Sequence, residues 1–461
     1  MPDQNGGPVS AGTGLFGAIF GRGTAPGGGP VADDGAWLRS MLAAEAALAR
    51  ALERAGLAPR GAGAAVTKAA DAADFGPAEL AELSRAAALT GSPVPGLARV
   101  LTRRVADPAA RAAVHAGAAS QDIMDTAAML LARDALGAAI SDLTAAADAA
   151  AGLAGAHRRT LMIGRTLLQQ AVPVTFGLVA AGWLSGLDSA VEWLAFVRDT
   201  RLAVQFGGTA GTLASLGADG TRVRALLAEE LGLADPPLPW HTERLRVIDV
   251  ATVSARACAA LSKIARDVTL LAQSEVGEVK GPPVAAVAIL GCARQAPGLL
   301  ATLVACAEQE HQRAAGAWQA EWQPYGHLLE LAASAAAWSR DLLAALEVDT
   351  ARMAANLAEA GGMPLAERVS ALLRGPLGAP QAHDLVATAA AKSAMSGVPL
   401  RDVLLATPEI ENTLTKAGIS HARVEAALDP AGYLGSSEAF ITAALAAHAR
   451  PTPGPVTAGA R

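Results

Sequence analysis

Aromatic residues and clusters of basic charge are scarce in this chain of 461 residues. Aromatic side chains make up only 3% of it, too few for the stacking surfaces that bind single-stranded nucleic acids. The net charge is −6 and the lysines and arginines form no block, which also argues against a surface for the phosphate backbone. We therefore predict that nucleic acids are not partners of this protein.

Cysteines are also few, and their positions exclude several kinds of site. Cys258, Cys292 and Cys306 show no Cys-x-x-Cys spacing, which predicts neither a disulfide framework nor structural zinc and favours a reducing cytoplasm. The histidines are scattered, and neither a glycine-rich phosphate loop with Lys-Ser/Thr nor a Gly-x-Ser-x-Gly elbow is present. We expect no metal and no cofactor.

No export or membrane segment is expected either. The first residues are rich in glycine and proline, without a basic stretch followed by an apolar one. The most apolar run, 283–292, is too short to span a bilayer. The sequence predicts a soluble cytoplasmic protein without a membrane partner.

Apolar residues are abundant, at 52%, and they recur at helical spacing. A helix is expected to begin at Asp34, and the two prolines within 91–95 exclude a helix interior there. Long helices are expected over 122–158, 173–204, 242–279, 284–319 and 324–347, and no strand of useful length is predicted.

The predicted fold is all-α, with three helical domains and a central long-helix bundle. Long helices lined with alanine in one chain leave apolar faces uncovered, so we expect an oligomer. The expected segments are a flexible arm over 1–33, an N-terminal helical domain over 34–107, a central long-helix bundle over 108–347, a C-terminal helical domain over 348–450 and a disordered tail over 451–461.

One polar segment, His115-Ala-Gly-Ala-Ala-Ser-Gln-Asp-Ile-Met-Asp-Thr-Ala127, interrupts the alanine-rich chain just before a helical pattern. The backbone N–H groups and dipole at a helix N-terminus favour an anion such as a carboxylate or phosphate. A capped helix start explains the same residues, because Ser120 and Asp122 are both good N-caps. The segment alone leaves both interpretations open.

Other polar turns accompany it. One of these turns contains Arg165, Thr166, Gln169 and Gln170. Its guanidinium and amide groups are suited to bind a carboxylate. A solvated surface loop explains the same residues equally well. A second holds His241 beside Trp240, where a structural histidine is the commoner outcome. The residues 308–313 are interpreted as a solvated helical face. Polar turns on a helical bundle without a metal or nucleotide motif suggest a pocket for a small polyanion and acid–base chemistry.

These segments together resemble the fumarase/aspartase superfamily, most closely its bacterial 3-carboxy-cis,cis-muconate cycloisomerase branch. The similarity runs from about 15 to 434. The segments that carry it are 115–127, Gly164-Arg-Thr-Leu-Leu-Gln-Gln-Ala-Val-Pro-Val-Thr-Phe-Gly177, 205–215, 238–242, 275–278, 308–311 and 318–322.

The resemblance implies a fold, an assembly and a reaction. It implies three helical domains, a homotetramer whose active sites lie where different subunits meet, and the addition of a carboxylate across a double bond to give a lactone in aromatic catabolism. It implies that His115 and Ser120 are catalytic. The residues implied to bind a small polycarboxylate substrate are Gln121, Asp122, Arg165, Thr166, Gln169, Gln170, His241 and Arg244.

Two positions depart from the family pattern. Ala119 replaces a threonine, and the signature Gly-Ser-Ser-x-Met-Pro-x-Lys-x-Asn-Pro loop, which supplies a serine base, is missing between Glu278 and Val284. The pattern does not identify Lys280 or Ser274 as a replacement. Three hypotheses stay open: a muconate cycloisomerase, a related lyase acting on another dicarboxylate, and a catalytically impaired homologue that assembles with an active partner.

Overall fold

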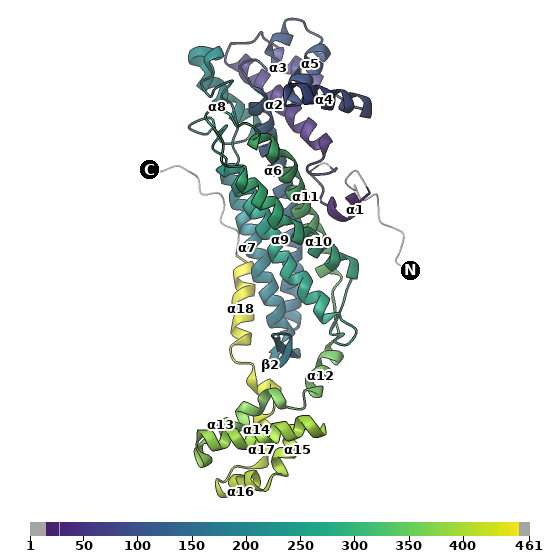
Figure 1. Ribbon diagram of the computed structural model, residues 1–461, viewed down its shortest axis with the longest axis vertical. Helices are drawn as coiled ribbons and strands as arrows, with labels where there is room; N and C mark the ends of the chain where they lie inside the picture. Colours follow the sequence, from purple (N-terminus) through teal and green to yellow (C-terminus); the bar gives the residue numbers. More distant parts are fainter. Residues whose placement is uncertain (1–14, 27, 451–461) are drawn as a thin grey trace.

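The computed structural model describes residues 15–26 and 28–450, and it confirms the all-α prediction. A long helical bundle lies between two smaller groups of helices, so that the described chain is elongated (Figure 1). The start of the predicted arm, 1–14, and the predicted tail, 451–461, lie outside the described residues.

The bundle is built on a helix that is buried on every side where it begins. Residues 121–132 of this helix, α6, are all buried, as expected for a helix at the centre of a core. Small alanine side chains allow its neighbours to approach closely. The bundle helices are α6 (Ser120–Ala156), α7 (Phe176–Thr200), α9 (Leu245–Leu271), α10 (Pro283–Ala305) and α11 (Ala317–Ala344).

Shorter helices cover the end of the bundle where α6 begins. They are α2 (Asp34–Arg54), α3 (Ala62–Asp71), α4 (Pro77–Thr90), α5 (Val94–Arg104) and α8 (Gly220–Leu231). Helix α2 begins at Asp34 as predicted, because the Asp33 side chain accepts a hydrogen bond from the backbone N–H of Ala36 at 2.8 Å. The predicted break also lies in place, since α4 ends before Gly91, whose φ is +71°.

Part of the predicted arm packs on the body. Helix α1 (Gly17–Phe20) leads to Arg22, whose guanidinium lies 3.9 Å from the ring centre of Trp338 and pairs with Asp341 on α11. The chain lies so close to α11 at Gly23 that a Cβ there would be 2.4 Å from the Cβ of Ala333.

The opposite end of the bundle carries a group of helices with a hydrophobic core of its own. They are α13 (Ala366–Leu377), α14 (Ala379–Ser396), α15 (Leu400–Leu405), α16 (Pro408–Lys416) and α17 (His421–Ala427), and α12 (Thr350–Glu359) connects them to the bundle. Helix α18 (Ser437–His448) was expected to belong to the same domain, within 348–450. It instead runs back along α7 and α6 (Figure 1).

The expectation of no strand is wrong at two places. Strands β1 (Leu161–Thr166) and β2 (Gln169–Thr175) form an antiparallel hairpin, and β3 (Val279–Lys280) pairs with β4 (Glu347–Val348). The hairpin turn has positive φ at Leu167 and Leu168, where glycine or asparagine would normally mark such a turn. Because the turn contains neither glycine nor asparagine, the sequence pattern predicts a loop here rather than a hairpin.

The helix boundaries differ from prediction at several further places, since α9 ends at Leu271 and α11 begins at Ala317. The helix expected over 284–319 ends at Ala305, and the chain from 306 to 316 forms a non-helical loop with φ +48° at His311 and +106° at Gly316. Residues 308–313 are therefore not a helical face, although Ala314 and Ala315 continue the helical composition. The helix expected over 242–279 begins only at Leu245.

Helix α10 is longer than the apolar run that the sequence analysis considered. Among the described residues it is the one helix long and apolar enough to cross a membrane by length and composition, with a mean hydropathy of 1.5. It packs between α9 and α11 in the bundle, and its Val284 and Val287 are 60% and 63% exposed in the single chain.

The return of α18 to the bundle should depend on pH. His448 lies between Asp188 on α7, at 2.9 Å, and Asp148 on α6, at 3.0 Å. Burial opposes the imidazolium, but the hydrogen bonds and charges of these two carboxylates outweigh it and raise the pKa of His448 above 6.5. The stabilisation is therefore complete below about pH 6.5 and lost as the pH rises through the raised pKa.

Unfolding curves of wild type and His448→Gln measured between about pH 6 and pH 9 test this dependence. The difference in unfolding free energy should be largest at the acidic end and shrink toward the alkaline end. A difference that does not change with pH would show that the imidazolium does not hold α18.

Candidate functional site

The first turn of α6 is held in place by one buried carboxylate. Asp122 accepts four hydrogen bonds: from the backbone N–H groups of Ala119 (2.8 Å), Gly207 (2.9 Å) and Gly208 (2.9 Å), and from Nε2 of His241 (2.7 Å). Its side chain is fully buried. Asp122 therefore joins the start of α6 to the loop after α7 and to the segment before α9.

This close packing explains the glycine at 207. A Cβ at Gly207 would lie 2.7 Å from Cε1 of His241 and 2.7 Å from Pro239, closer than packed carbon atoms come. The histidine is 4% exposed and its Nε2 is engaged by Asp122. Two of the predicted site residues, Asp122 and His241, are thus bonded to each other and buried.

A second buried network lies one turn further along α6. Arg244 donates two hydrogen bonds to Asp125 (2.8 and 3.0 Å) and two to Glu321 on α11 (3.0 and 2.6 Å). Burial disfavours the charged guanidinium, but the two carboxylates outweigh it and raise the pKa of Arg244. Trp318 donates to Asp125 at 3.0 Å. All four side chains are buried, so Arg244 stabilises the fold at this place.

His115 is partly exposed, whereas the side chains of the two networks are buried. Its Nδ1 is 2.7 Å from Oε1 of Glu45 on α2, and its backbone N–H donates to Oε2 of the same carboxylate at 2.9 Å. Burial alone would lower the pKa of the imidazole, but the hydrogen bond and charge of Glu45, with the charge of Asp122, raise it above 6.5. The side chain is 23% exposed.

Arg313, in the 306–316 loop, was not among the predicted site residues. Its guanidinium donates to the backbone oxygens of Gly208 (2.8 Å) and Thr209 (2.9 Å) and to Oε1 of Gln121 (3.2 Å). All three acceptors are neutral, and no carboxylate in the described part of the chain pairs with it. Sequence patterns could not identify this role of Arg313, because it depends on the loop that replaces the expected helix.

The groups at this end of α6 form a surface suited to an anion. The half-buried hydroxyl of Ser120 opens the helix, and the first N–H groups of an α-helix have no acceptor within it. The guanidinium of Arg313 donates to Gln121, the next residue of the helix, and the imidazole of His115 is close enough to Asp122 for its charge to act on the ring. We call these three side chains the anion cluster; hydrogen-bond donors and positive charge of this kind bind a carboxylate and stabilise an enolate.

The remaining predicted residues lie on the β1–β2 hairpin. Arg165 makes two hydrogen bonds of 2.8 Å to Glu278, which also accepts from Asn356 on α12. The other three side chains are exposed around the hairpin turn: Thr166, Gln169 and Gln170. Arg165 is thus neutralised within the chain, while its neighbours are free to meet another molecule.

The connection in which the family's signature loop is missing lies at the same end of the bundle as the β1–β2 hairpin. Strand β3 leads within three residues into α10, and Lys280 lies 3.3 Å from the Asp349 carboxylate. The Lys280 side chain is therefore paired beside β4.

The two groups of predicted residues do not meet in one chain. Ser120 is the first residue of α6, and the hairpin follows its last residue, Ala156. A helix of 37 residues is roughly 55 Å long at 1.5 Å per residue. Figure 1 shows β2 and the start of α6 at opposite ends of the bundle.

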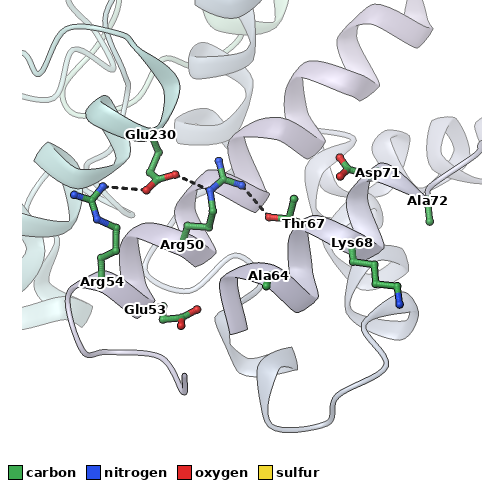
Figure 2. A pocket seen from close by; sticks show the side chains of 9 residues that line it. All are labelled: Arg50, Glu53, Arg54, Ala64, Thr67, Lys68, Asp71, Ala72 and Glu230. Carbon is green, nitrogen blue, oxygen red and sulfur yellow. Dashed lines mark hydrogen bonds and ion pairs between the residues drawn. The ribbon is translucent and has the colours of Figure 1, made fainter. Parts of the chain in front are cut away.

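Another hollow of about 920 Å³ lies in the N-terminal group of helices, away from both groups of predicted residues. Figure 2 shows that two of its cations face an acidic partner: Arg50 and Arg54 both pair with Glu230, at 2.6 and 2.9 Å. The charges of these two arginines are therefore compensated. Among the described residues, no group of three or more His, Cys, Asp or Glu side chains is placed to hold a metal.

Comparison with known proteins identifies relatives over nearly the whole chain. The profile of a family described as lyase matches residues 32–285. Nitrosuccinate lyase of Streptomyces davaonensis is 41% identical over 97% of this chain and 95% of its own, and 3-carboxy-cis,cis-muconate cycloisomerase of Bradyrhizobium diazoefficiens is 40% identical over 89% and 93%. The crystal structure of 3-carboxy-cis,cis-muconate lactonizing enzyme from Pseudomonas putida superimposes with a TM-score of 0.85 at 38% identity, covering 94% of this chain and 98% of that one.

Removal of the Arg244 guanidinium should destabilise the protein. Arg244→Ala would leave Asp125 and Glu321 buried without a cation, which typically costs about 3–5 kcal/mol. Urea denaturation measures the loss. The matched control is Arg54→Ala, which removes exposed ion pairs to Glu229 and Glu230 and should change stability by less than about 1 kcal/mol. An Arg244→Ala protein of normal stability would contradict the structural role.

Proposed function

Because this chain belongs to the lyase family of the fumarase/aspartase superfamily, we propose that it is a 3-carboxy-cis,cis-muconate cycloisomerase-type enzyme. The observation that carries the proposal is the anion cluster, in which Arg313 has no carboxylate partner among the described residues and adjoins the start of α6. Such a cluster suits a substrate that carries several carboxylates.

The chemistry requires an acid and an anion site. One carboxylate oxygen of the substrate adds to a carbon of a double bond, and the electron pair of that bond moves to the neighbouring carbon and its carboxylate. A proton must then reach that carbon, and His115, with its raised pKa, is the group placed to donate it. Arg313, Ser120 and the N-terminus of α6 hold the carboxylate on which negative charge develops.

The proposal includes a homotetramer whose sites combine segments of different subunits. In one chain, the anion cluster and the exposed hairpin residues Thr166, Gln169 and Gln170 are separated by the length of α6. Large apolar side chains are also exposed, among them Leu167 (96%) and Leu168 (71%) at the hairpin turn. Contact with a second copy would cover these leucines and bring the hairpin to an anion cluster.

In this assembly, the predicted substrate-binding residues divide into two kinds. Thr166, Gln169 and Gln170 contact the substrate from a neighbouring subunit. Four others lie buried beneath the anion cluster and support it: Gln121, Asp122, His241 and Arg244. Arg165 supports the hairpin through its hydrogen bonds to Glu278. A cytoplasmic location is part of the proposal, supported by the three free, buried cysteines.

A related lyase activity is the second candidate. The nitrosuccinate lyase aligns with 97% of this chain, more than the 89% of the cycloisomerase from Bradyrhizobium. Elimination of nitrite from nitrosuccinate would use the same two elements, a site for carboxylates and a group that exchanges a proton at the carbon beside one of them. The short β3–α10 connection bears on both candidates, because the family's serine loop is missing there.

Turnover assays with the purified protein distinguish the candidates. Loss of 3-carboxy-cis,cis-muconate absorbance is expected if the first proposal is correct, and release of nitrite from nitrosuccinate if the second is. Since a positioned acid–base group contributes about 10²–10⁴-fold, loss of the loop's serine should make either rate low but measurable. A folded tetramer that turns over neither compound would favour the impaired homologue.

Arg313→Gln should weaken substrate binding without affecting the fold. A charge-assisted hydrogen bond contributes about 1.5–3 kcal/mol, so kcat/KM should fall about 10- to 100-fold. Arg401→Gln is the control, since Arg401 pairs with Glu425 and Asp402 in the C-terminal group of helices. Unchanged kinetics in Arg313→Gln, with normal thermal stability, would remove Arg313 from the site.

A further inference from the structure

Glu45 is a buried carboxylate in the otherwise apolar middle of α2, where its neighbours in sequence are alanines and leucines. It is 0% exposed and far from His115 in sequence, yet both of its oxygens are used on that one residue. Oε2 accepts the backbone N–H at 2.9 Å, and Oε1 lies 2.7 Å from the ring Nδ1. A carboxylate buried this way is expected to have a specific role, because burying it alone is costly.

The backbone of His115 is unusual at the same point. Its φ is +59°, in the left-handed region that residues other than glycine seldom adopt, although His, Asn and Asp adopt it more often than the rest. The hydrogen bond from its N–H to Glu45 supports this conformation, and the ring is half-buried where the charge of Asp122 acts on it. One carboxylate therefore controls both the backbone and the ring of His115.

The two hydrogen bonds also restrict the protonation of the ring. A carboxylate only accepts hydrogen bonds, so Nδ1 must carry a proton to donate to Oε1. The ring is then either the Nδ1–H tautomer or the doubly protonated imidazolium, and in both cases Nε2 is the nitrogen available to a substrate. Only the imidazolium has an Nε2 proton to give.

We propose that Glu45 is a positioning residue for the reaction of this site, which keeps the His115 ring oriented and protonated so that Nε2–H is the acid that faces the substrate. This inference rests on the proposed function for the step that uses the proton. The orientation of His115 and the proton on its Nδ1 follow from the Glu45 contacts whatever the substrate is.

The surrounding charges agree with this role. Glu45 from α2 and Asp122 from α6 both raise the pKa of His115, against the effect of burial, which lowers it. Arg313, the cation of the neighbouring loop, donates to Gln121, Gly208 and Thr209 rather than to the ring. A substrate carboxylate bound by Arg313 would add a further negative charge and stabilise the imidazolium until the proton is transferred.

Glu45→Gln tests the proposal by changing one acceptor into a donor. The amide oxygen must accept the backbone N–H of His115, which leaves the amide NH₂ facing Nδ1. Nδ1 must then accept, so the ring becomes the neutral Nε2–H tautomer and its pKa falls. The volume of the side chain is almost unchanged.

The primary measurement is the titration of the His115 ring by NMR, assigned from the resonance that disappears in His115→Gln. The pKa of His115 should lie above 6.5 in the wild-type protein and fall by about one unit or more in Glu45→Gln. In the active enzyme, the limb of the kcat profile that requires the protonated acid should move by the same amount, while KM changes less than about twofold.

Asp188→Asn is the matched control, because it makes the same chemical change beside another histidine. It should lower the pKa of His448, which Asp188 contacts at 2.9 Å, and leave the pKa of His115 and the kcat profile unchanged. If Glu45→Gln does not fold, Glu45→Asp keeps the charge but shortens the reach, and it should lower kcat while the pKa of His115 stays raised.

An unchanged pKa of His115 in Glu45→Gln would overturn the proposal. So would a lowered pKa with an unmoved kcat profile, because His115 would then not be the acid. Absence of turnover in the wild-type protein would contradict the proposed function, but the NMR titration would still decide whether Glu45 orients and protonates His115. The two failures are therefore distinguishable.

Discussion

The length of α6 is the constraint on which the rest of the structure depends. Its 37 residues separate the anion cluster from the β1–β2 hairpin by roughly 55 Å. Both ends carry residues that the family resemblance assigns to one active site, so no movement within a single chain can join them. The burial of α6 on every side over residues 121–132 fixes its first turns within the core. An assembly in which copies pack side by side in opposite directions satisfies this constraint.

Buried hydrogen bonds and ion pairs beneath the anion cluster stabilise the surface that carries it. Asp122 joins three backbone N–H groups and His241, and Arg244 joins Asp125 to Glu321. Asp122, His241 and Arg244 were expected to bind the substrate, and in the structure their hydrogen bonds are made within the chain. The groups left for a ligand are few: Ser120, the ring of His115 and the guanidinium of Arg313. Buried networks of this kind stabilise one arrangement because an unsatisfied member would be costly.

Much of the fold could be predicted from helical spacing, capping and proline positions, as the start of α2 at Asp34 and the break at Gly91 show. The β1–β2 hairpin could not, because Leu167 and Leu168 adopt positive φ in its turn without the usual glycine or asparagine. The polar residues of 115–127 were recognisable, but which of them face solvent depends on packing. The role of Glu45 could not be predicted either, because its partner His115 is distant in the sequence. The role of Arg313 could not be predicted, because nearby alanines continue the helical composition beyond Ala305, where α10 ends.

The central claim is that each active site combines the anion cluster of one subunit with the hairpin of another. Its most direct test is a mixture of two inactive variants, His115→Ala and the double variant Gln169→Ala/Gln170→Ala, dissociated together and reassembled. If the sites are shared, some sites in the mixed tetramers contain neither change, and activity returns to a fraction of wild type. If each site is built from one subunit, every site keeps one defect and the mixture stays as inactive as its components, which would contradict the account.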